Sequence, residues 1–237
     1  MNRLLVSGDS FTSCWPLEEE LGHRKFGWPN LVSKYFDIDL VDKSRAGSSN
    51  YRIYRKAFEG LIDQNIDFVL VFLTSWTRFE TGNTKAEKPS GIFQCLNKRD
   101  LPIFEHFFNG YKNYSDTLRM ISSLQAIAEM HRTPCYYIDT FRNNIYRDIT
   151  IRQFKEILKY NPIIFDNMDD NRIQQKFKKI KNIEKSIDWS KFISKKSYEE
   201  LIDGCPLIKN HPGKDGHKKM SEIVIQFIEE VNNAKAI

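Results

Sequence analysis

Cysteine is scarce in this chain of 237 residues, which holds four, and none has a second cysteine or a histidine at metal-ligand spacing. A disulfide framework and a zinc site are therefore not indicated, and scattered thiols are typical of a reducing compartment. No apolar run approaches the ~18 residues that a membrane helix needs. The first residues lead into a strand, not into a cleavable signal sequence. We therefore expect a cytoplasmic protein with no membrane partner.

Other absences narrow the classes of function. The phosphate-binding strings GxxxxGK[ST] and GxGxxG are missing, as are HExxH and EF-hand patterns, so we predict no metal and no cofactor. The net charge of +5 is too weak by itself to indicate a nucleic-acid partner. A content of 41% hydrophobic and 13% aromatic residues excludes a disordered chain. Nothing in the sequence indicates an oligomeric state.

What is present is an alternation of short apolar strands with amphipathic helices. The run at 68–73 is apolar throughout, which is typical of a central parallel strand covered on both faces. This alternation predicts βαβ units and a parallel sheet. We expect strands at 3–7, 39–41, 68–73 and 135–138, and helices at 28–36, 50–62, 115–131 and over the apolar stripe from Met220 to Val231.

Two segments, at about 79–113 and 140–203, do not follow the alternation. We interpret residues 1–237 as a single domain that carries these segments as insertions. Within 171–196, nine basic residues stand against two acidic ones. This basic stretch is interpreted either as amphipathic helices with a solvated cationic face or as a lid that attracts an anionic substrate or polymer.

The sequence places a serine and a histidine where a parallel sheet positions reactive groups. Gly8-Asp9-Ser10 follows the first strand, so the Ser10 hydroxyl is expected at the carboxyl edge of the sheet, where such sheets bind ligands. His211, in the string HPG, comes just before the last helix. The two residues predict a nucleophile and its base. The alternatives are an ordinary Gly-Asp-Ser turn and a histidine that caps the last helix.

These pieces resemble the SGNH hydrolases, also called the GDSL esterase/lipase family, over residues 3–75, 115–139 and 205–231. The resemblance implies a three-layer α/β/α sandwich with a parallel, flavodoxin-like sheet of about five strands. It also implies that Ser10 is the nucleophile, that His211 is the general base, and that the backbone N–H groups of Ser10 and Gly47 bind the oxyanion. A glycine turn at a helix N-terminus points free N–H groups at an anion for independent reasons.

The chain departs from the family in the third block, where Gly-x-Asn-Asp is replaced by the string TSWTRFE. Trp76 falls about where the family has its oxyanion-binding Asn. Asn50 or Thr77 is then expected to supply the missing donor. Arg78 either clamps a substrate anion or pairs with Glu80. Asp9 joins these residues as a candidate substrate-binding or oxyanion residue.

The fourth block is half present, because Ile208 stands where the family has the acid of its triad. Asp203, Asp139 or a backbone carbonyl is then expected to orient the His211 imidazole. Asp139 ends the fourth strand, and it is interpreted either as a substrate ligand or as a cap of the next turn. His217 lies inside the last helix and is expected to be solvated or structural.

The working function is hydrolysis of an acyl or O-acetyl ester of a small molecule or carbohydrate through an acyl-enzyme. The alternative is a non-catalytic SGNH-like binding domain for an anionic or carbohydrate ligand, with Trp76, Arg78 and the basic stretch as contacts. A third possibility is acyl transfer, in which an alcohol replaces water.

Overall fold

The computed structural model describes residues 2–17, 24–63, 65–78, 109–142, 145–159, 165–166 and 168–235. The first predicted insertion lies outside the described residues as far as position 108, and so does Glu80. The second insertion, at 140–203, is described for most of its length and is helical.

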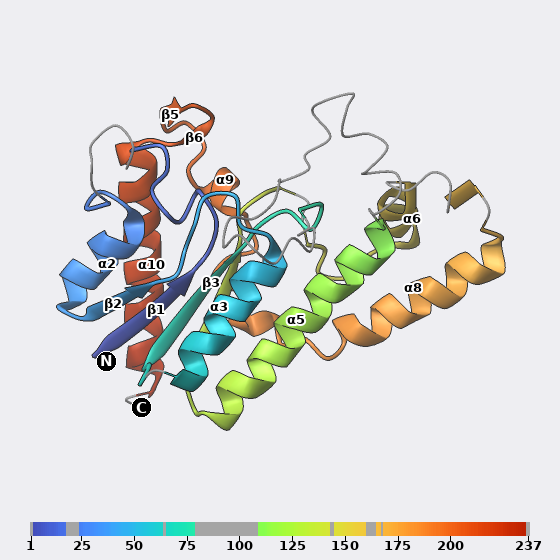
Figure 1. The fold of residues 1–237 in the computed structure, drawn as a ribbon, viewed down its shortest axis with the longest axis horizontal. Helices are drawn as coiled ribbons and strands as arrows, with labels where there is room; N and C mark the ends of the chain where they lie inside the picture. The colour runs from blue at the N-terminus through green and yellow to red at the C-terminus, as the bar shows by residue number, and fades with distance from the viewer. Residues whose placement is uncertain are drawn as a thin grey trace, which may run out of the picture.

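The sheet is parallel, and its strand order is β2-β1-β3-β4 (Figure 1). This order is the one that a flavodoxin-like sheet uses. All six residues of β3 are buried, as expected for a central strand with an unbroken apolar sequence. The strands are β1 (Arg3–Ser7), β2 (Asp39–Asp42), β3 (Phe68–Leu73) and β4 (Cys135–Asp139).

In the described residues a fifth strand is reduced to a single bridge beside β4. Phe192 pairs in parallel with Tyr137, and the N–H of Ile193 donates to the carbonyl of Tyr137 at 2.9 Å. A 3-10 turn at Trp189–Lys191 comes directly before this bridge, so the segment is not extended for long enough to pair further. The described sheet therefore has four strands, where about five were predicted.

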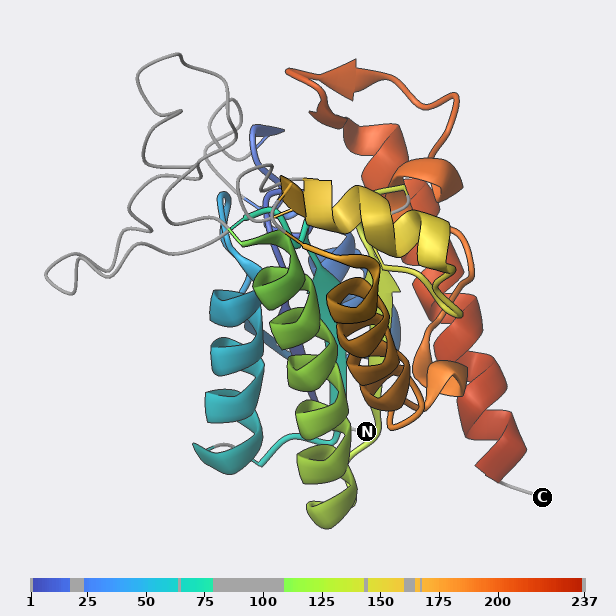
Figure 2. The same ribbon diagram turned by 90° about the vertical axis from the view of Figure 1, so that its right-hand side faces the viewer.

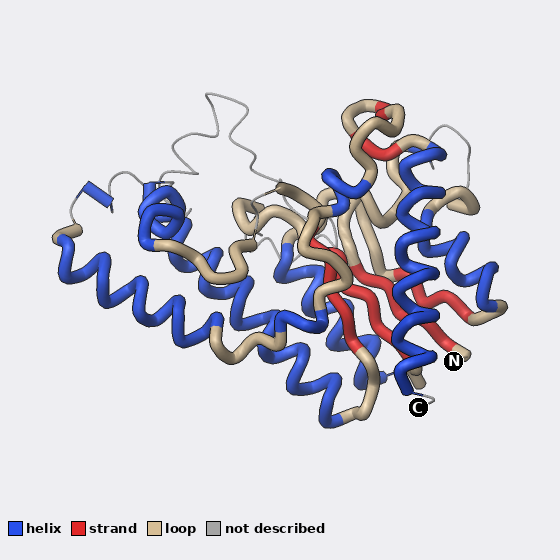
Figure 3. Tube along the Cα trace, turned by 180° about the vertical axis from the view of Figure 1, so that it is seen from behind, coloured by secondary structure: helices blue, strands red, loops and turns tan. Residues whose placement is uncertain are grey.

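Helices cover both faces of the sheet, which confirms the three-layer α/β/α architecture. α3 and α5 pack side by side on one face, and α8 lies along α5. α10 and α2 pack together on the other face (Figures 2 and 3). The helices are α2 (Trp28–Phe36), α3 (Asn50–Asp63), α5 (Gly110–Met130), α6 (Ile151–Lys159), α8 (Asp170–Glu184), α9 (Tyr198–Leu201) and α10 (Lys214–Lys235).

The basic stretch belongs to the helical layer. α8 is capped by Asp169, whose side chain accepts the N–H of Arg172. The helix buries Ile173 and Ile180 in the core that α3, α5 and α6 share. After α8 the chain returns to the sheet, where Phe192 stacks on Tyr137. This packing supports the interpretation as an amphipathic helix with a solvated cationic face.

Candidate active site

The serine is carried by a tight turn at the end of β1, here called the nucleophile turn (residues 8–13). The carbonyl of Asp9 accepts the N–H groups of Thr12 and Ser13 at 3.1 and 2.9 Å, which closes one helical turn. A Cβ atom on Gly8 would lie 2.2 Å from Oγ1 of Thr12, so only glycine fits there. Ser10, at the start of this turn, is 4% exposed.

The histidine is carried by a short hairpin, here called the base hairpin (residues 207–212). Its strands, β5 (Leu207–Ile208) and β6 (His211–Pro212), pair antiparallel. The two loop residues, Lys209 and Asn210, both have positive φ values of 48° and 62°. This is the pattern of a type I′ turn, which suits the twist of a two-residue hairpin. The sequence analysis missed this hairpin, and Asn210 was its one local signal.

The nucleophile turn and the base hairpin bring the predicted pair together. Nε2 of His211 lies 2.9 Å from Oγ of Ser10, and Nδ1 lies 2.8 Å from the carbonyl oxygen of Lys209. Because a carbonyl only accepts, the proton sits on Nδ1, and the lone pair of Nε2 faces the serine hydroxyl. The imidazole is half-buried, with the Trp15 ring edge-on to it at 4.6 Å.

Neither predicted acid orients the imidazole, so that prediction is wrong for both side chains. The carboxylate of Asp203 is 78% exposed and pairs with Arg142 at 3.7 Å. The carboxylate of Asp139 accepts the N–H of Ile145 at 2.9 Å, as a residue that closes a turn does. The backbone carbonyl of Lys209 takes the place of the acid.

The backbone N–H groups of Ser10 and Gly47 were both predicted to bind an oxyanion. Gly47 has a φ of 78°, a conformation that glycine adopts without strain. Its turn is tied to the nucleophile turn, because the N–H of Arg45 donates to the carbonyl of Gly8 at 3.1 Å. Neither the N–H of Ser10 nor that of Gly47 donates to any residue that the structure describes. Both stay candidates for binding an oxyanion.

The predicted third donor is not Asn50. The side chain of Asn50 accepts the N–H of Thr74 at 2.8 Å and donates to the carbonyl of Thr74 at 2.9 Å. Its remaining amide hydrogen points to Oγ1 of Thr117 at 3.4 Å. The amide therefore fixes the end of β3 against α3 and has no hydrogen left for a substrate.

Of the other two candidates in the third block, Thr77 can still bind an oxyanion and Trp76 cannot. The hydroxyl of Thr77 shares a 2.7 Å hydrogen bond with that of Ser75, so it stays a candidate donor. Trp76 is 6% exposed and lies in the core, where it meets Tyr114 edge-on at 5.9 Å. Trp76 is therefore a core residue and not a substitute for the Asn of the family.

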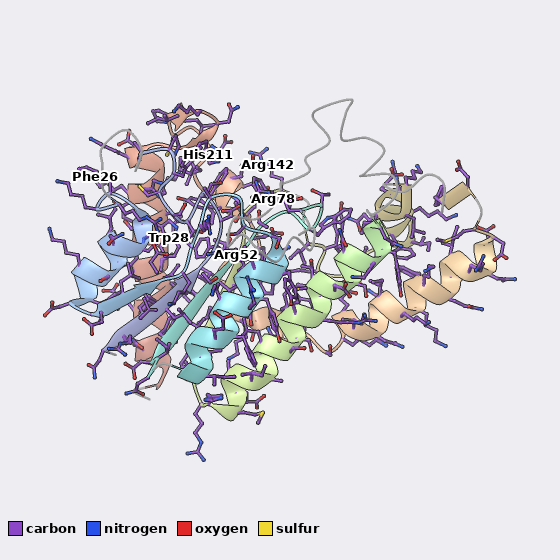
Figure 4. The ribbon with its side chains drawn as sticks, in the orientation of Figure 1. Phe26, Trp28, Arg52, Arg78, Arg142 and His211 are labelled. Atoms are coloured by element: carbon purple, nitrogen blue, oxygen red, sulfur yellow. The ribbon has the colours of Figure 1, made fainter. Side chains whose placement is uncertain are left out.

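Arg78 and Asp9 contact each other, which neither interpretation of Arg78 anticipated. Nη1 of Arg78 lies 3.2 Å from Oδ2 of Asp9, and the two side chains are 8% and 0% exposed. A carboxylate buried to this degree is not a substrate contact, so the prediction for Asp9 is wrong. Burial raises the pKa of Asp9, and the nearby charge of Arg78 opposes that rise. Figure 4 shows Arg78 at the same end of the sheet as His211.

His217 is structural and not solvated. Its side chain is fully buried, with Nδ1 3.4 Å from the N–H of Trp28 and 3.3 Å from the hydroxyl of Tyr198. Burial lowers the pKa of His217 to about 4, so the ring is neutral at pH 7.

In the described part of the chain, no three or more His, Cys, Asp or Glu side chains come together in a way that could hold a metal ion. None of the helices described is both long and apolar enough to cross a membrane.

No model of a known protein family matches the sequence, and no curated protein matches it. Solved structures do match over nearly the whole chain. TesA is 12% identical, covers 97% of this chain and 99% of its own, and has a TM-score of 0.52. The psychrotrophic esterase EstA from a Pseudoalteromonas species is 13% identical, covers 98% and 100%, and also has a TM-score of 0.52.

A third similar structure is a catalytic mutant of an acetylxylan esterase from Geobacillus stearothermophilus. It is 17% identical, covers 96% of this chain and 94% of its own, and has a TM-score of 0.51. At these identities the likeness concerns the path of the backbone. The chain therefore has the fold of the SGNH hydrolases, in a divergent form.

Proposed function

We propose that the protein is a serine ester hydrolase that works through an acyl-enzyme on Ser10. The observation that carries this proposal is the hydrogen bond of 2.9 Å between Oγ of Ser10 and Nε2 of His211. The lone pair of Nε2 faces the hydroxyl because Nδ1 is occupied by the carbonyl of Lys209 at 2.8 Å. A serine beside a correctly oriented base is the arrangement that acyl transfer needs.

The proposed reaction uses this geometry in two steps. Oγ of Ser10 attacks the ester carbonyl while Nε2 of His211 takes the hydroxyl proton. The tetrahedral intermediate collapses, the C–O bond to the alcohol breaks, and Nε2 returns the proton to the leaving oxygen. Water then attacks the acyl-serine, with His211 again as the base, and releases the acid. During both steps the carbonyl of Lys209 accepts the Nδ1–H bond of the imidazolium.

The oxyanion is assigned to the backbone N–H groups of Ser10 and Gly47, with the Thr77 hydroxyl as a third candidate. Loss of one oxyanion donor typically lowers the rate by ~10²–10³. Since Trp76 is in the core and the amide of Asn50 is occupied by Thr74, we expect a slower enzyme than one with a complete site.

The substrate class proposed is an acyl or O-acetyl ester of a small molecule or carbohydrate. Two similar structures are of enzymes described as an esterase and as an acetylxylan esterase, which supports this class. The ring of Trp15, which is half-buried, stands 4.6 Å from the imidazole ring. Aromatic surfaces of this kind suit an apolar acyl group or a sugar ring.

The test combines p-nitrophenyl acetate with a serine-reactive fluorophosphonate probe. We expect the wild-type protein to hydrolyse the ester and to be labelled, and Ser10→Ala to lose both. Ser13→Ala is the matched control, because Ser13 is in the same turn and its buried hydroxyl has no partner among the described residues. Labelling that survives in Ser10→Ala, or is lost in Ser13→Ala, would contradict the assignment of the nucleophile.

The second candidate is a non-catalytic binding domain for an anionic or carbohydrate ligand. The observation that favours it is the altered third block, where Trp76 is buried and the amide of Asn50 is occupied by the backbone of Thr74. A wild-type protein that is folded, inactive on the ester and unlabelled by the probe would support this candidate. Product analysis with an added alcohol separates hydrolysis from acyl transfer.

A further inference from the structure

Asp9, the residue before the proposed nucleophile, is held by three donors. Its Oδ1 accepts the N–H of Phe11 at 3.0 Å. Its Oδ2 accepts the hydroxyl of Thr74 at 2.8 Å and lies 3.2 Å from Nη1 of Arg78. Thr74 and Arg78 follow the end of β3, so the carboxylate joins the nucleophile turn to a segment more than sixty residues away in sequence.

Arg78 is held mainly by charge and stacking. Its Nη1 atom makes the contact with Asp9, while Nε is buried and has no partner among the described residues. The guanidinium lies over the Phe141 ring at 5.3 Å, a cation–π contact. Phe141 in turn packs on Phe11, in the nucleophile turn, with ring centroids 5.2 Å apart. Arg78 therefore supports the turn through a charge and a ring.

The charge of Asp9 is within electrostatic reach of the base. Burial raises the pKa of Asp9, whereas the charges of Arg78 and His211 and the hydrogen bonds from Thr74 and Phe11 lower it. Tyr198 of α9 also faces Asp9, but burial raises the pKa of its phenol well above the ordinary value, so it stays neutral. Arg78 is therefore the permanent positive charge that favours an ionised Asp9.

The base needs such a charge because its triad acid is missing. Nδ1 of His211 faces a neutral carbonyl, that of Lys209, and not a carboxylate. A triad acid normally stabilises the imidazolium that forms when the serine loses its proton. The buried carboxylate of Asp9, the neighbour of Ser10, interacts electrostatically with His211 and can provide this negative charge.

We propose that Arg78 is a positioning residue that acts through Asp9. It holds the nucleophile turn against the end of β3 and keeps Asp9 as the negative charge that stabilises the His211 imidazolium. The inference rests on the proposed function and adds to it a residue outside the proton-transfer chain. Substrate contact by Arg78 is a different role, and the kinetic test separates the two.

The experiment measures kcat and KM for p-nitrophenyl acetate between pH 6 and 9 in Arg78→Gln and Arg78→Lys. We expect Arg78→Gln to lower kcat at neutral pH by about 10²-fold with KM little changed. A misplacement of Ser10 relative to His211 slows the chemical step without weakening substrate binding. We expect kcat of this variant to recover as the pH rises and Asp9 ionises. Arg78→Lys should regain most of kcat, since one charged contact carries the role.

Arg142→Gln is the matched control. Arg142 lies at the same end of the sheet (Figure 4), but its side chain is 53% exposed and its pair with Asp203 is 3.7 Å long. We expect it to keep wild-type kcat and KM, because exposed pairs contribute little. A rise in KM with unchanged kcat in Arg78→Gln would overturn the positioning role and assign Arg78 to the substrate.

A variant that removes both charges covers the case in which Arg78→Gln does not fold. Asp9→Asn/Arg78→Met leaves no unpaired buried charge, so it is expected to fold, as neutral replacements of buried pairs often do, and to keep the loss of kcat. If the wild type is active and this double variant has wild-type kcat, only the present inference is overturned. If the folded wild type neither hydrolyses the ester nor reacts with the probe, the proposed function fails first.

Discussion

Ser10 and His211 share one hydrogen bond, but the segments that carry them are held in opposite ways. The nucleophile turn is buried, with Asp9 fully enclosed and Ser10 4% exposed, and its contacts reach residues far away in sequence. The base hairpin is exposed at its loop, and Leu207 is 57% exposed. Its two strands are two residues long and contact each other. The nucleophile turn is therefore part of the core, whereas the base hairpin is a short local structure at its edge.

This difference has a consequence for mutations. Contacts in the core contribute to the free energy of unfolding as well as to geometry, so changes in the nucleophile turn affect both. A hairpin that buries little contributes little to stability, so changes there affect activity alone. The comparison between the two segments is therefore testable as a split between stability and rate.

The largest expected effect comes from the base itself. His211→Gln should lower kcat on the order of 10³-fold or more, because no other described group accepts the proton of Ser10. The free energy of unfolding should change little, since the imidazole is half-buried in the exposed hairpin. Steady-state kinetics and urea unfolding measure the two effects. A large loss of stability would show that the base hairpin is part of the core and would break the comparison.

A smaller loss of rate is expected when the turn of the hairpin is changed. Lys209 has a φ of 48°, which proline cannot adopt, so Lys209→Pro should displace the carbonyl that orients Nδ1. We expect kcat to fall by about 10²-fold, the scale of a 1 Å misplacement, with little change in unfolding by urea. Lys209→Asn is the control, because asparagine accepts positive φ and keeps the carbonyl. Wild-type kcat in the proline variant would show that the carbonyl does not orient the base.

A change beside the nucleophile turn should have the opposite effect, with a large loss of unfolding free energy and a small loss of kcat. Asn50→Ala removes both hydrogen bonds between this buried amide and the backbone of Thr74. The expected loss is about 2–4 kcal/mol of unfolding free energy, with kcat of the folded protein changed less than about tenfold. Asn113→Ala is the control, because the buried amide nitrogen of Asn113 has no described partner. A kcat loss of about 10²-fold without destabilisation would restore Asn50 as an oxyanion donor.

The sequence allowed the pairing of Ser10 with His211 to be predicted, because both positions are set by the topology of the sheet. A serine after the first strand and a histidine before the last helix reach the same edge in any parallel α/β sheet. The unbroken apolar run of β3 likewise identified the central strand. These features depend on the order of the helices and strands and on burial, and both can be inferred from the pattern of apolar and polar residues.

The parts that could not be predicted depend on backbone groups and on distant pairs. Every residue has a carbonyl, so nothing in the sequence marks that of Lys209 as the partner of Nδ1. The pairing of Arg78 with Asp9 joins residues from two strand ends, and a neighbouring Glu80 was the simpler partner from sequence. Asn50 was expected to face a substrate because amides are good donors. In the structure, its amide nitrogen instead donates to the carbonyl of Thr74 at the end of β3.

The smallest expected effect concerns His217, which lies six residues after His211 in sequence but is fully buried. Its pKa is lowered to about 4 by burial, against 6.5 for the free side chain. A depressed pKa gives stability that is present above pH 6.5 and is lost as the pH falls toward 4. Between pH 7 and pH 5 this one group should cost about 2 kcal/mol of unfolding free energy. Urea titrations at the two pH values measure the loss.

His217→Asn is the variant that isolates this effect. Its side-chain oxygen keeps an acceptor near the position of Nδ1, which faces the N–H of Trp28, but it does not titrate. The carboxyl groups titrate in both proteins, so the difference between the two pH dependences belongs to His217. An equal loss in both proteins would mean that the imidazole is hydrated in the native state. The solvent-accessible part of the chain would then extend beyond the base hairpin and include His217 in the first turn of α10.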